Sequence, residues 1–398
     1  MATVRLEPEI RATQRVPRAV AVAWCLLILN TLGSTGAQTV IPIPRSVIQL
    51  VTMGALVTAF VLALVVNLGL RIRPSAYLTL LTLLLVVSIL ASLDLQSGLG
   101  ALFRCFRLSV FIATLWLLTR WWDGRMQFVR YHIKGYGIVL LSVAIGLVVS
   151  PGNAMPEIYG GRLSGAIWPL TPPQIAQYAA VISGLALLLW LGKRADRRSV
   201  LFIVIPAVAL LMLTHTRTAT LGLIIGLLVA LLSLGLTSAR ARKVFAWFAL
   251  VAGFSAVALG SLLQAWFLRG QSEDNFSTLT GRAKVWDALL SAPRSVGENL
   301  FGVGLGDKSY DGLPIDNSWL AVFHEQGLVG CALVAAFLLV LVAIAVLRPP
   351  SLERACAIFL IVYCISASYT EAGLGDASPY LLHLAVAGSL LARGETTR

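Results

Sequence analysis

Long apolar runs separated by short polar segments dominate the chain. A helix that crosses a bilayer needs about 20 mainly apolar residues, because the hydrocarbon core is about 30 Å thick. Windows of this kind predict spans at 19–36, 46–68, 75–93, 100–119, 133–150, 173–192, 198–213, 217–236, 244–266, 317–347, 352–370 and 378–393. The runs are too long and too uniform for barrel strands. We therefore predict an all-α polytopic membrane protein with about twelve transmembrane helices.

Composition agrees with this pattern. The chain has 398 residues, of which 58% are hydrophobic and 12% are charged. Soluble proteins are usually about 45–50% apolar and about 25% charged, so a water-soluble or disordered chain is excluded. The 5 cysteines show no CxxC or CxxH spacing. We therefore expect neither a disulfide framework nor a metal site, and no cofactor.

The charges predict how the helices are oriented. With the N-terminus placed in the cytoplasm, every cytoplasmic connection is basic, whereas most of the 18 acidic residues fall on the outer side. This distribution follows the positive-inside rule and predicts that both termini are cytoplasmic. The formal net charge of +13 is therefore interpreted as a topology signal, and no nucleic-acid partner is expected.

Four parts follow from the predicted spans. Residues 1–18 are a cytoplasmic N-terminal segment, and residues 19–266 carry helices 1–9 with an outer loop at 151–172. Residues 267–316 form a large extracytoplasmic loop between helices 9 and 10. Residues 317–398 carry helices 10–12 and a short cytoplasmic tail. Loops of this length are uncommon unless they are functional, so we expect the active chemistry on the outer side.

The large loop contains one predicted helix. Thr280 is a suitable N-cap, and Pro293 ends the pattern. The apolar side chains between them lie on one face: Val285, Trp286, Leu289 and Leu290. An amphipathic helix of this kind is expected to lie on the membrane surface.

Several arginines on the outer side are candidate site residues. Arg217 follows Thr214-His215-Thr216, Arg282 begins the amphipathic helix, and Arg162 lies among glycines. Each has an alternative as a solvated or snorkelling side chain, which we disfavour for Arg217. Arg104 and Arg107 share one helix face, and snorkelling is the favoured interpretation for both.

The segment before the tenth span carries further polar groups. A glycine run at 302–306 is not a dinucleotide fingerprint, because no βαβ unit is available. We expect it to be a flexible turn that returns Asp316 and Asn317 to the membrane. His324 is a natural general base, although a lone histidine at a helix end is more often structural. His132, on the cytoplasmic side, and His383 are weaker candidates.

Taken in order, these segments resemble the O-antigen ligase and polymerase family of bacterial envelope glycosyltransferases. The motifs that carry the resemblance are Gly161-Arg162-Leu163-Ser164-Gly165, Leu213-Thr214-His215-Thr216-Arg217-Thr218, Gly281-Arg282 followed by Trp286, the glycine run, Asn317-Ser318-Trp319-Leu320, and Glu325-Gln326-Gly327-Leu328-Val329-Gly330. Two positions depart from the family pattern. Thr216 stands where the family usually has serine, and Asp316 stands where it has the histidine that precedes Asn317.

The resemblance implies transfer of a glycan from a polyprenyl diphosphate carrier to an acceptor hydroxyl on a glycan, lipid or protein. The reaction would invert the anomeric centre, need no metal, and occur on the outer face of the bacterial cytoplasmic (inner) membrane. Arginine suits a diphosphate because it is permanently charged and grips phosphate oxygens in pairs. The implied diphosphate-binding residues are Arg217, Arg282 and Arg162, with Thr216, His215, Trp286 and Asn317 in support.

Two questions stay open at the level of sequence. Either Asp316 or His324 supplies the catalytic base. A polysaccharide polymerase that uses the same donor is the main alternative to a ligase. A lipid-linked oligosaccharide flippase is the second alternative, and a non-catalytic membrane protein is the weakest. A flippase should carry charge towards both leaflets, whereas here the polar groups gather on one side.

Overall fold

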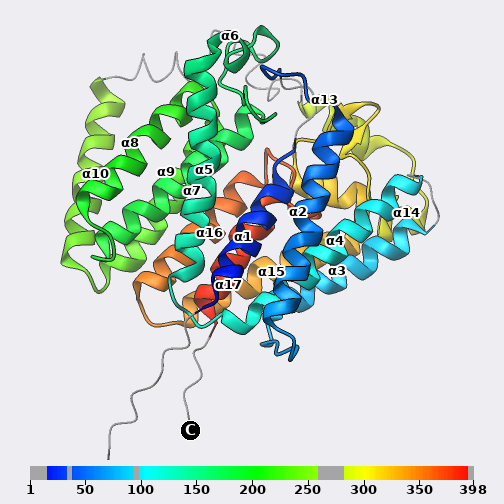
Figure 1. The fold of residues 1–398 in the computed structure, drawn as a ribbon, viewed down its shortest axis with the longest axis horizontal. Coiled ribbons are helices and arrows are strands. Elements are labelled where there is room, and N and C mark those ends of the chain that lie inside the picture. The colour runs from blue at the N-terminus through cyan, green and yellow to red at the C-terminus, as the bar shows by residue number, and fades with distance from the viewer. Residues whose placement is uncertain (1–15, 34–37, 94–97, 259–281, 393–398) are drawn as a thin grey trace, which may run out of the picture.

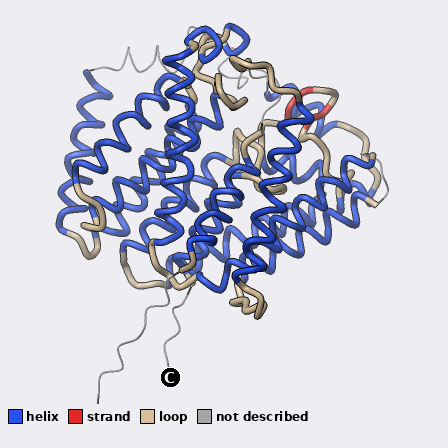
Figure 2. The backbone as a smooth tube through the Cα atoms, viewed as in Figure 1, coloured by secondary structure: helices blue, strands red, loops and turns tan. Residues whose placement is uncertain are grey.

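The computed structural model describes residues 16–33, 38–93, 98–258 and 282–392. These residues are mostly helical and form a bundle with short connections (Figures 1 and 2). Among the described residues, six helices are long and apolar enough to cross a membrane: α2 (Arg45–Val66), α4 (Leu99–Leu118) with the 3-10 turn η1 (Thr119–Trp121), α5 (Gln127–Val149), α7 (Pro172–Leu191), α9 (Arg217–Gly235) and α15 (Ser318–Leu347).

The other helices vary in length. Six more overlap the remaining predicted spans: α1 (Arg18–Thr31), α3 (Ala76–Ser92), α8 (Arg197–Leu213), α10 (Ala239–Ala258), α16 (Leu352–Ala367) and α17 (Pro379–Leu391). Shorter elements lie in the loops: α6 (Pro151–Ala154), η2 (Glu157–Tyr159), α13 (Arg282–Ser291) and α14 (Val296–Phe301). Each predicted span therefore overlaps a described helix, which agrees with an all-α membrane protein. The count of about twelve spans stays a prediction.

Local sequence explains where several helices begin. Ser75, Asp196, Ser351 and Ser378 each accept a hydrogen bond from a backbone N–H in the first turn of α3, α8, α16 and α17. Such caps satisfy donors that have no partner inside the helix. Polar residues at the edges of apolar runs thus fix the helix boundaries.

Close contact between helices depends on small residues. Gly184 of α7 faces the ring of Phe359 on α16, and a Cβ atom added there would lie 2.1 Å from that ring. Gly226 of α9 lies against the same phenylalanine. Small residues allow such approach between helices in lipid, where apolar burial alone drives little association. Large apolar side chains stay exposed elsewhere on the bundle, including Leu50, Phe202 and Leu347, as expected for a surface that contacts lipid.

The longest helix, α15, is broken near its start. Gly327 adopts φ 66° and ψ −167°, which is not helical, so residues 318–326 form a separate segment from residues 328–347. A Cβ atom at Gly327 would lie 2.3 Å from the backbone of Leu300, so only glycine fits. The single continuous span predicted at 317–347 is therefore wrong in this detail.

A chain of hydrogen-bonded side chains, which we call the histidine network, runs through the core of the bundle. Trp24 Nε1 donates to His132 Nδ1 at 3.3 Å, and His132 Nε2 lies 2.7 Å from His383 Nδ1. The other ring nitrogen of His383 lies 3.0 Å from the side-chain amide of Gln177. Both imidazoles are fully buried. His132, which we predicted at the cytoplasmic side, therefore lies inside α5 and packs within the core.

Several described loops lie at one edge of the bundle, whereas others, such as the connection between α2 and α3, lie at the opposite edge. Helices α6 and α13 lie at the upper edge in Figure 1, together with the hairpin of β1 (Ser309–Tyr310) and β2 (Leu313–Pro314). The start of α1 and the end of α17 lie towards the opposite edge. The polar loops that carry most of the candidate residues are thus held together at one end of an apolar bundle.

Candidate active site

A cavity of about 920 Å³ lies among the ends of α2, α4, α7 and α13 and the loops beside them. Its described lining includes six cationic side chains: Arg45, Arg104, Arg107, Arg162, Arg282 and Lys308. It also includes three carboxylates: Asp307, Asp316 and Glu371. The excess of cations over carboxylates makes the cavity suitable for an anionic ligand.

Arg282 and Asp316 face each other in this cavity. Arg282 begins α13, and Asp316 directly precedes the N-cap of α15. Arg282 Nε donates to Asp316 Oδ2 at 3.0 Å, and each side chain is about one-third exposed. Arg282 also lines the cavity, and its hydrogen bonding to other described residues is confined to this contact with Asp316.

Arg162 is anchored to the turn between α8 and α9. Its Nε donates to the carbonyl of Thr214 at 2.8 Å, and its Nη2 donates to the hydroxyl of Thr216 at 2.9 Å. Thr216 therefore positions an arginine rather than facing the cavity itself. His215, in the same turn, is half-buried and adopts a left-handed φ of 48°.

The three predicted arginines act on one another electrostatically. Burial lowers the pKa of the Arg162 guanidinium, and Glu371 opposes that effect, while the positive charges of Arg282 and Arg217 lower the pKa further. Arg217 is the first residue of α9 and is not among the residues that line the cavity. Its charge acts on Arg162, which lines the cavity, and the hydroxyl of its neighbour Thr218 is hydrogen-bonded to that of Thr370, directly before Glu371.

Glu371 is a cavity residue that the sequence analysis missed. It lies in the connection between α16 and α17, directly after Thr370. Burial raises its pKa to about 7, and the negative charge of Asp316 adds to that rise, while Arg282 and Arg162 oppose it. The available signal was an acidic residue in a short glycine-rich connection between two predicted spans, on the predicted outer side.

Two other predicted residues have structural contacts. The side-chain oxygen of Asn317 accepts from the backbone N–H groups of Trp319 and Leu320, and its amide donates to the carbonyl of Tyr369. Asn317 thus caps α15. Trp286 packs edge-on against the ring of Tyr369 at 5.7 Å and links α13 to the α16–α17 connection. Thr280, the predicted cap of this helix, lies outside the described residues.

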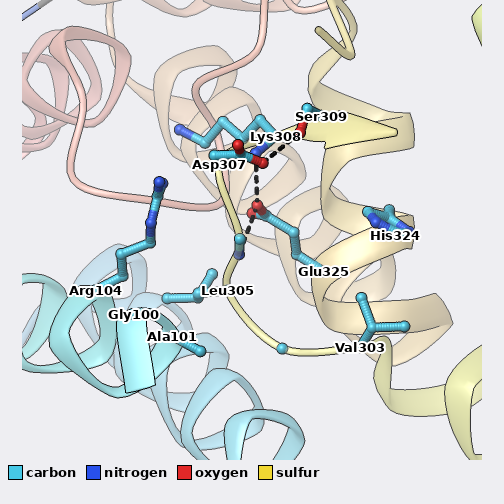
Figure 3. Close-up of a pocket in the computed structure, with 12 residues that line it drawn as sticks. Gly100, Ala101, Arg104, Val303, Leu305, Asp307, Lys308, Ser309, His324 and Glu325 are labelled. Atoms are coloured by element: carbon cyan, nitrogen blue, oxygen red, sulfur yellow. Dashed lines mark hydrogen bonds between the residues drawn. The ribbon is translucent and has the colours of Figure 1, made fainter. Parts of the chain in front are cut away.

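His324 lies apart from Asp316. It lines a neighbouring cavity of about 370 Å³, where its Nδ1 lies 2.9 Å from Arg294 Nη2 and its ring stacks edge-on against Tyr310. Figure 3 shows His324 on the far side of Glu325 from Arg104. The structure therefore does not bring the two predicted base candidates into one cavity.

The glycine run is packed against the bundle, and the flexible turn that we expected is wrong. Gly304 N donates to the carbonyl of Glu325 at 3.0 Å, and the N–H groups of Gly306 and Lys308 donate to Glu325 Oε1 (Figure 3). A Cβ atom at Gly302 would lie 2.3 Å from the backbone of α15. The glycines thus permit close docking of the loop onto α15.

Arg104 and Arg107 point into the protein, although we favoured snorkelling for both. Arg107 Nη2 donates to the carbonyls of Asn30 and Ala377 at 3.1 and 3.2 Å. Arg104 lines both cavities, so these cavities adjoin. Lys308 also lines both, and its Nζ lies 3.6 Å from the buried carboxylate of Asp376. These cations therefore belong to the cavity walls.

Metal-ligand geometry is absent from the described part of the chain, where no three His, Cys, Asp or Glu side chains are grouped to hold an ion. The metal-independent interpretation stays a prediction. Comparison of the sequence with protein-family models and with curated proteins gave no match.

Proposed function

We propose that this protein is a membrane glycosyltransferase that moves a glycan from a polyprenyl diphosphate carrier to an acceptor hydroxyl. The cavity lined by Arg162, Arg282, Asp316 and Glu371 would be its active site, on the outer face of the bacterial cytoplasmic membrane. The observation that carries the proposal is the set of six cations against three carboxylates at the end of an apolar bundle. An amphiphilic donor with an anionic head and a polyprenyl tail matches both environments.

The chemistry requires stabilised negative charge on the leaving diphosphate. Fixed arginines stabilise such charge where water is scarce, and no metal ion is needed for this role. Arg282 lines the cavity, and Arg162, whose charge interacts with it, is held in place by Thr214 and Thr216. Arg217 adds a third positive charge at the cavity edge. Direct attack by the acceptor oxygen would invert the anomeric centre.

A ligase is favoured by the sequence resemblance, and a polymerase that uses the same donor is the alternative. A lipid-linked oligosaccharide flippase is the second alternative, because it also binds diphosphate. The charged lining of the cavity comes from loops and from the beginnings of helices at one end of the bundle. This one-sided arrangement supports a transferase over a carrier that serves both leaflets.

The decisive experiment uses the purified protein in lipid vesicles with a lipid-linked oligosaccharide donor and an acceptor. We expect release of polyprenyl diphosphate and attachment of the glycan to the acceptor. Movement of intact donor across the bilayer without bond cleavage would instead identify a flippase. Deletion of the gene then separates the two transferases. Unattached polymer accumulates when a ligase is lost, and single repeat units accumulate when a polymerase is lost.

A further inference from the structure

We propose that Glu371 is the catalytic base that takes the proton from the acceptor hydroxyl, and that Asp316 instead holds Arg282 in position. This inference rests on the proposed glycosyl transfer. The resemblance to known glycosyltransferases pointed to Asp316 or His324, and neither carries the features that a base in this cavity needs.

Availability of the carboxylate is the first argument. Asp316 already accepts a charge-assisted hydrogen bond from Arg282 at 3.0 Å, so one of its carboxylate oxygens is engaged in holding the guanidinium. His324 lies in the neighbouring cavity, where its Nδ1 faces Arg294. Glu371 lines the large cavity, and its carboxylate makes no hydrogen bond or ion pair with any described residue. Its oxygens are thus free to accept from a ligand.

Rigid anchoring of the Glu371 backbone is the second argument. Its N–H donates to the carbonyl of Ala367 at 3.0 Å, and its own carbonyl accepts from the hydroxyl of Ser318 at 2.6 Å. The same Ser318 hydroxyl accepts from Gly373 N at 2.9 Å. Ser318 is buried and is the first residue of α15, so three hydrogen bonds fix the connection that carries Glu371. A base must be held within hydrogen-bond reach of its substrate, and this connection provides that constraint.

The electrostatic surroundings of Glu371 are the third argument. Its pKa of about 7 is raised first by burial and then by Asp316, which precedes α15, and is lowered by Arg282 of α13 and Arg162 of the outer loop. Tyr363 of α16 and Tyr380 of α17 also interact electrostatically with it. A carboxylate that titrates near neutrality is a far stronger base than an ordinary glutamate, while remaining largely ionised slightly above pH 7.

In the proposed step, one bond forms at the anomeric carbon, one bond breaks there, and one proton moves to Glu371. The acceptor O–H gives its proton to a Glu371 carboxylate oxygen while the acceptor oxygen forms a bond to the anomeric carbon. The bond between that carbon and the diphosphate oxygen breaks, and its electron pair leaves with the diphosphate. The positive charges of Arg282, Arg162 and Arg217 stabilise the added negative charge. Glu371 then returns the proton to water.

The test compares Glu371→Gln, Asp316→Asn and His324→Gln in purified protein assayed with a lipid-linked donor. We expect Glu371→Gln to lower kcat by about 10²–10⁴-fold with little change in the donor KM, because a general base contributes about that factor. The wild-type rate should rise with pH through about 7, and this rise should disappear in the Gln variant. Glu371→Asp should restore part of the rate. Glu157→Gln is the matched control, since Glu157 is an exposed carboxylate of the outer loop.

Three outcomes have different meanings. A Glu371→Gln variant that keeps wild-type kcat and pH dependence overturns the base assignment and leaves the proposed function intact. Binding of farnesyl diphosphate, a short analogue of the polyprenyl diphosphate carrier, is measured separately from transfer. If Glu371→Gln lost this binding as well as kcat, the base assignment would also be overturned, because Glu371 would then act in folding or in ground-state binding. If the wild-type protein transfers no glycan under conditions where it binds farnesyl diphosphate, the proposed function itself fails.

Discussion

The arginine-lined cavity and the histidine network are two polar regions within the same apolar bundle, and they use their polar groups differently. In the network, each imidazole nitrogen has a protein partner, and both rings are fully buried. In the cavity, Glu371 has no described partner, and Arg282 makes one hydrogen bond from a group with five donors. The imidazole nitrogens of the network are therefore all paired, whereas the cavity has donors and acceptors that no described residue pairs with.

The hydrogen bonds of the histidine network also require both imidazole rings to be neutral. The Trp24 indole only donates, so His132 Nδ1 accepts and His132 Nε2 carries the proton that bonds His383. His383 Nε2 then carries a proton and needs an acceptor, so the hydrogen-bond pattern assigns the Gln177 oxygen to the position where the structure places its Nε2. All demands are met with neutral rings, which is the least costly way to keep histidines in a membrane interior.

This difference in hydrogen bonding separates polar residues that stabilise the fold from polar residues that are available to bind a ligand. Buried polar groups that satisfy one another stabilise and specify packing. Unsatisfied charge in a partly desolvated cavity costs stability and is retained where binding repays it. Gln177 belongs to both regions, because it bonds His383 and also lines the cavity. The network therefore supports one wall of the site.

After Glu371→Gln, the largest expected effect comes from removing an arginine inside the cavity, Arg282, or one near it, Arg217. Arg282→Ala and Arg217→Ala should each lower glycan transfer by about 10²–10³-fold, the usual loss when one fixed donor to developing negative charge is removed. Transfer from a purified lipid-linked donor is the measurement, with expression and membrane insertion unchanged. Arg125→Ala is the matched control, since Arg125 is well exposed and pairs with Asp123 outside the cavity. Wild-type transfer by both arginine variants would show that the site is assigned to the wrong residues.

A smaller effect is expected when the ion pair in the cavity is broken. Asp316→Asn removes the charge that holds Arg282, but a partly exposed ion pair contributes only about 0.2–1 kcal/mol. Transfer should therefore fall by less than about tenfold, chiefly through a changed donor KM. A fall as large as that of Glu371→Gln would instead identify Asp316 as the base.

The helices were predictable because apolar length and capping residues are local properties of the sequence. Each predicted span overlaps a described helix, and residues such as Ser75 and Asp196 mark helix starts. The break at Gly327 was not predictable, because the glycine lies in a long apolar run and only the packing of Leu300 against it requires the break.

The site was predictable only in part, because its residues come from connections far apart in the chain. Motif order pointed to Arg162, Arg282 and Asp316, which do line one cavity. Periodicity places Arg107 on a helix face but cannot show that the carbonyl of Ala377 packs against that face. Glu371 carries no motif, and its importance depends on neighbours from three other elements.

Replacing His383 tests whether the histidine network serves the fold and not the chemistry. His383→Leu leaves His132 Nε2 and the Gln177 amide without their partners, and each unsatisfied buried group costs about 1–3 kcal/mol. We expect the Tm in detergent to fall by at least about 3 °C. Transfer per folded molecule should change by less than about fivefold, because the network reaches the cavity through Gln177, which is not a proposed reacting group, and a coupling of about 1 kcal/mol corresponds to that factor.

Ser389→Ala is the matched control for the network, because the Ser389 hydroxyl bonds only within its own helix, to the carbonyl of Val386. Its Tm should match that of the wild-type protein. If His383→Leu kept the wild-type Tm but lost transfer, the network would take part in the chemistry, and the distinction drawn between the two regions would be wrong.

The smallest expected effect is the change in stability caused by Glu371 as pH is varied. The folded-state pKa of about 7 exceeds the ordinary value of 4.5, so ionising Glu371 disfavours the folded state. The contribution of Glu371 to the free energy of unfolding is fully present below pH 4.5 and is lost as pH rises through 7. Glutamine does not ionise, so the Glu371→Gln variant does not lose this contribution at high pH. Glu371→Gln should therefore raise the Tm by about 2 °C or more near pH 8, with the difference narrowing towards pH 5. Exposed Glu157→Gln should show no such trend, and a Glu371→Gln variant that is less stable near pH 8 would show that the cavity stabilises the ionised carboxylate instead.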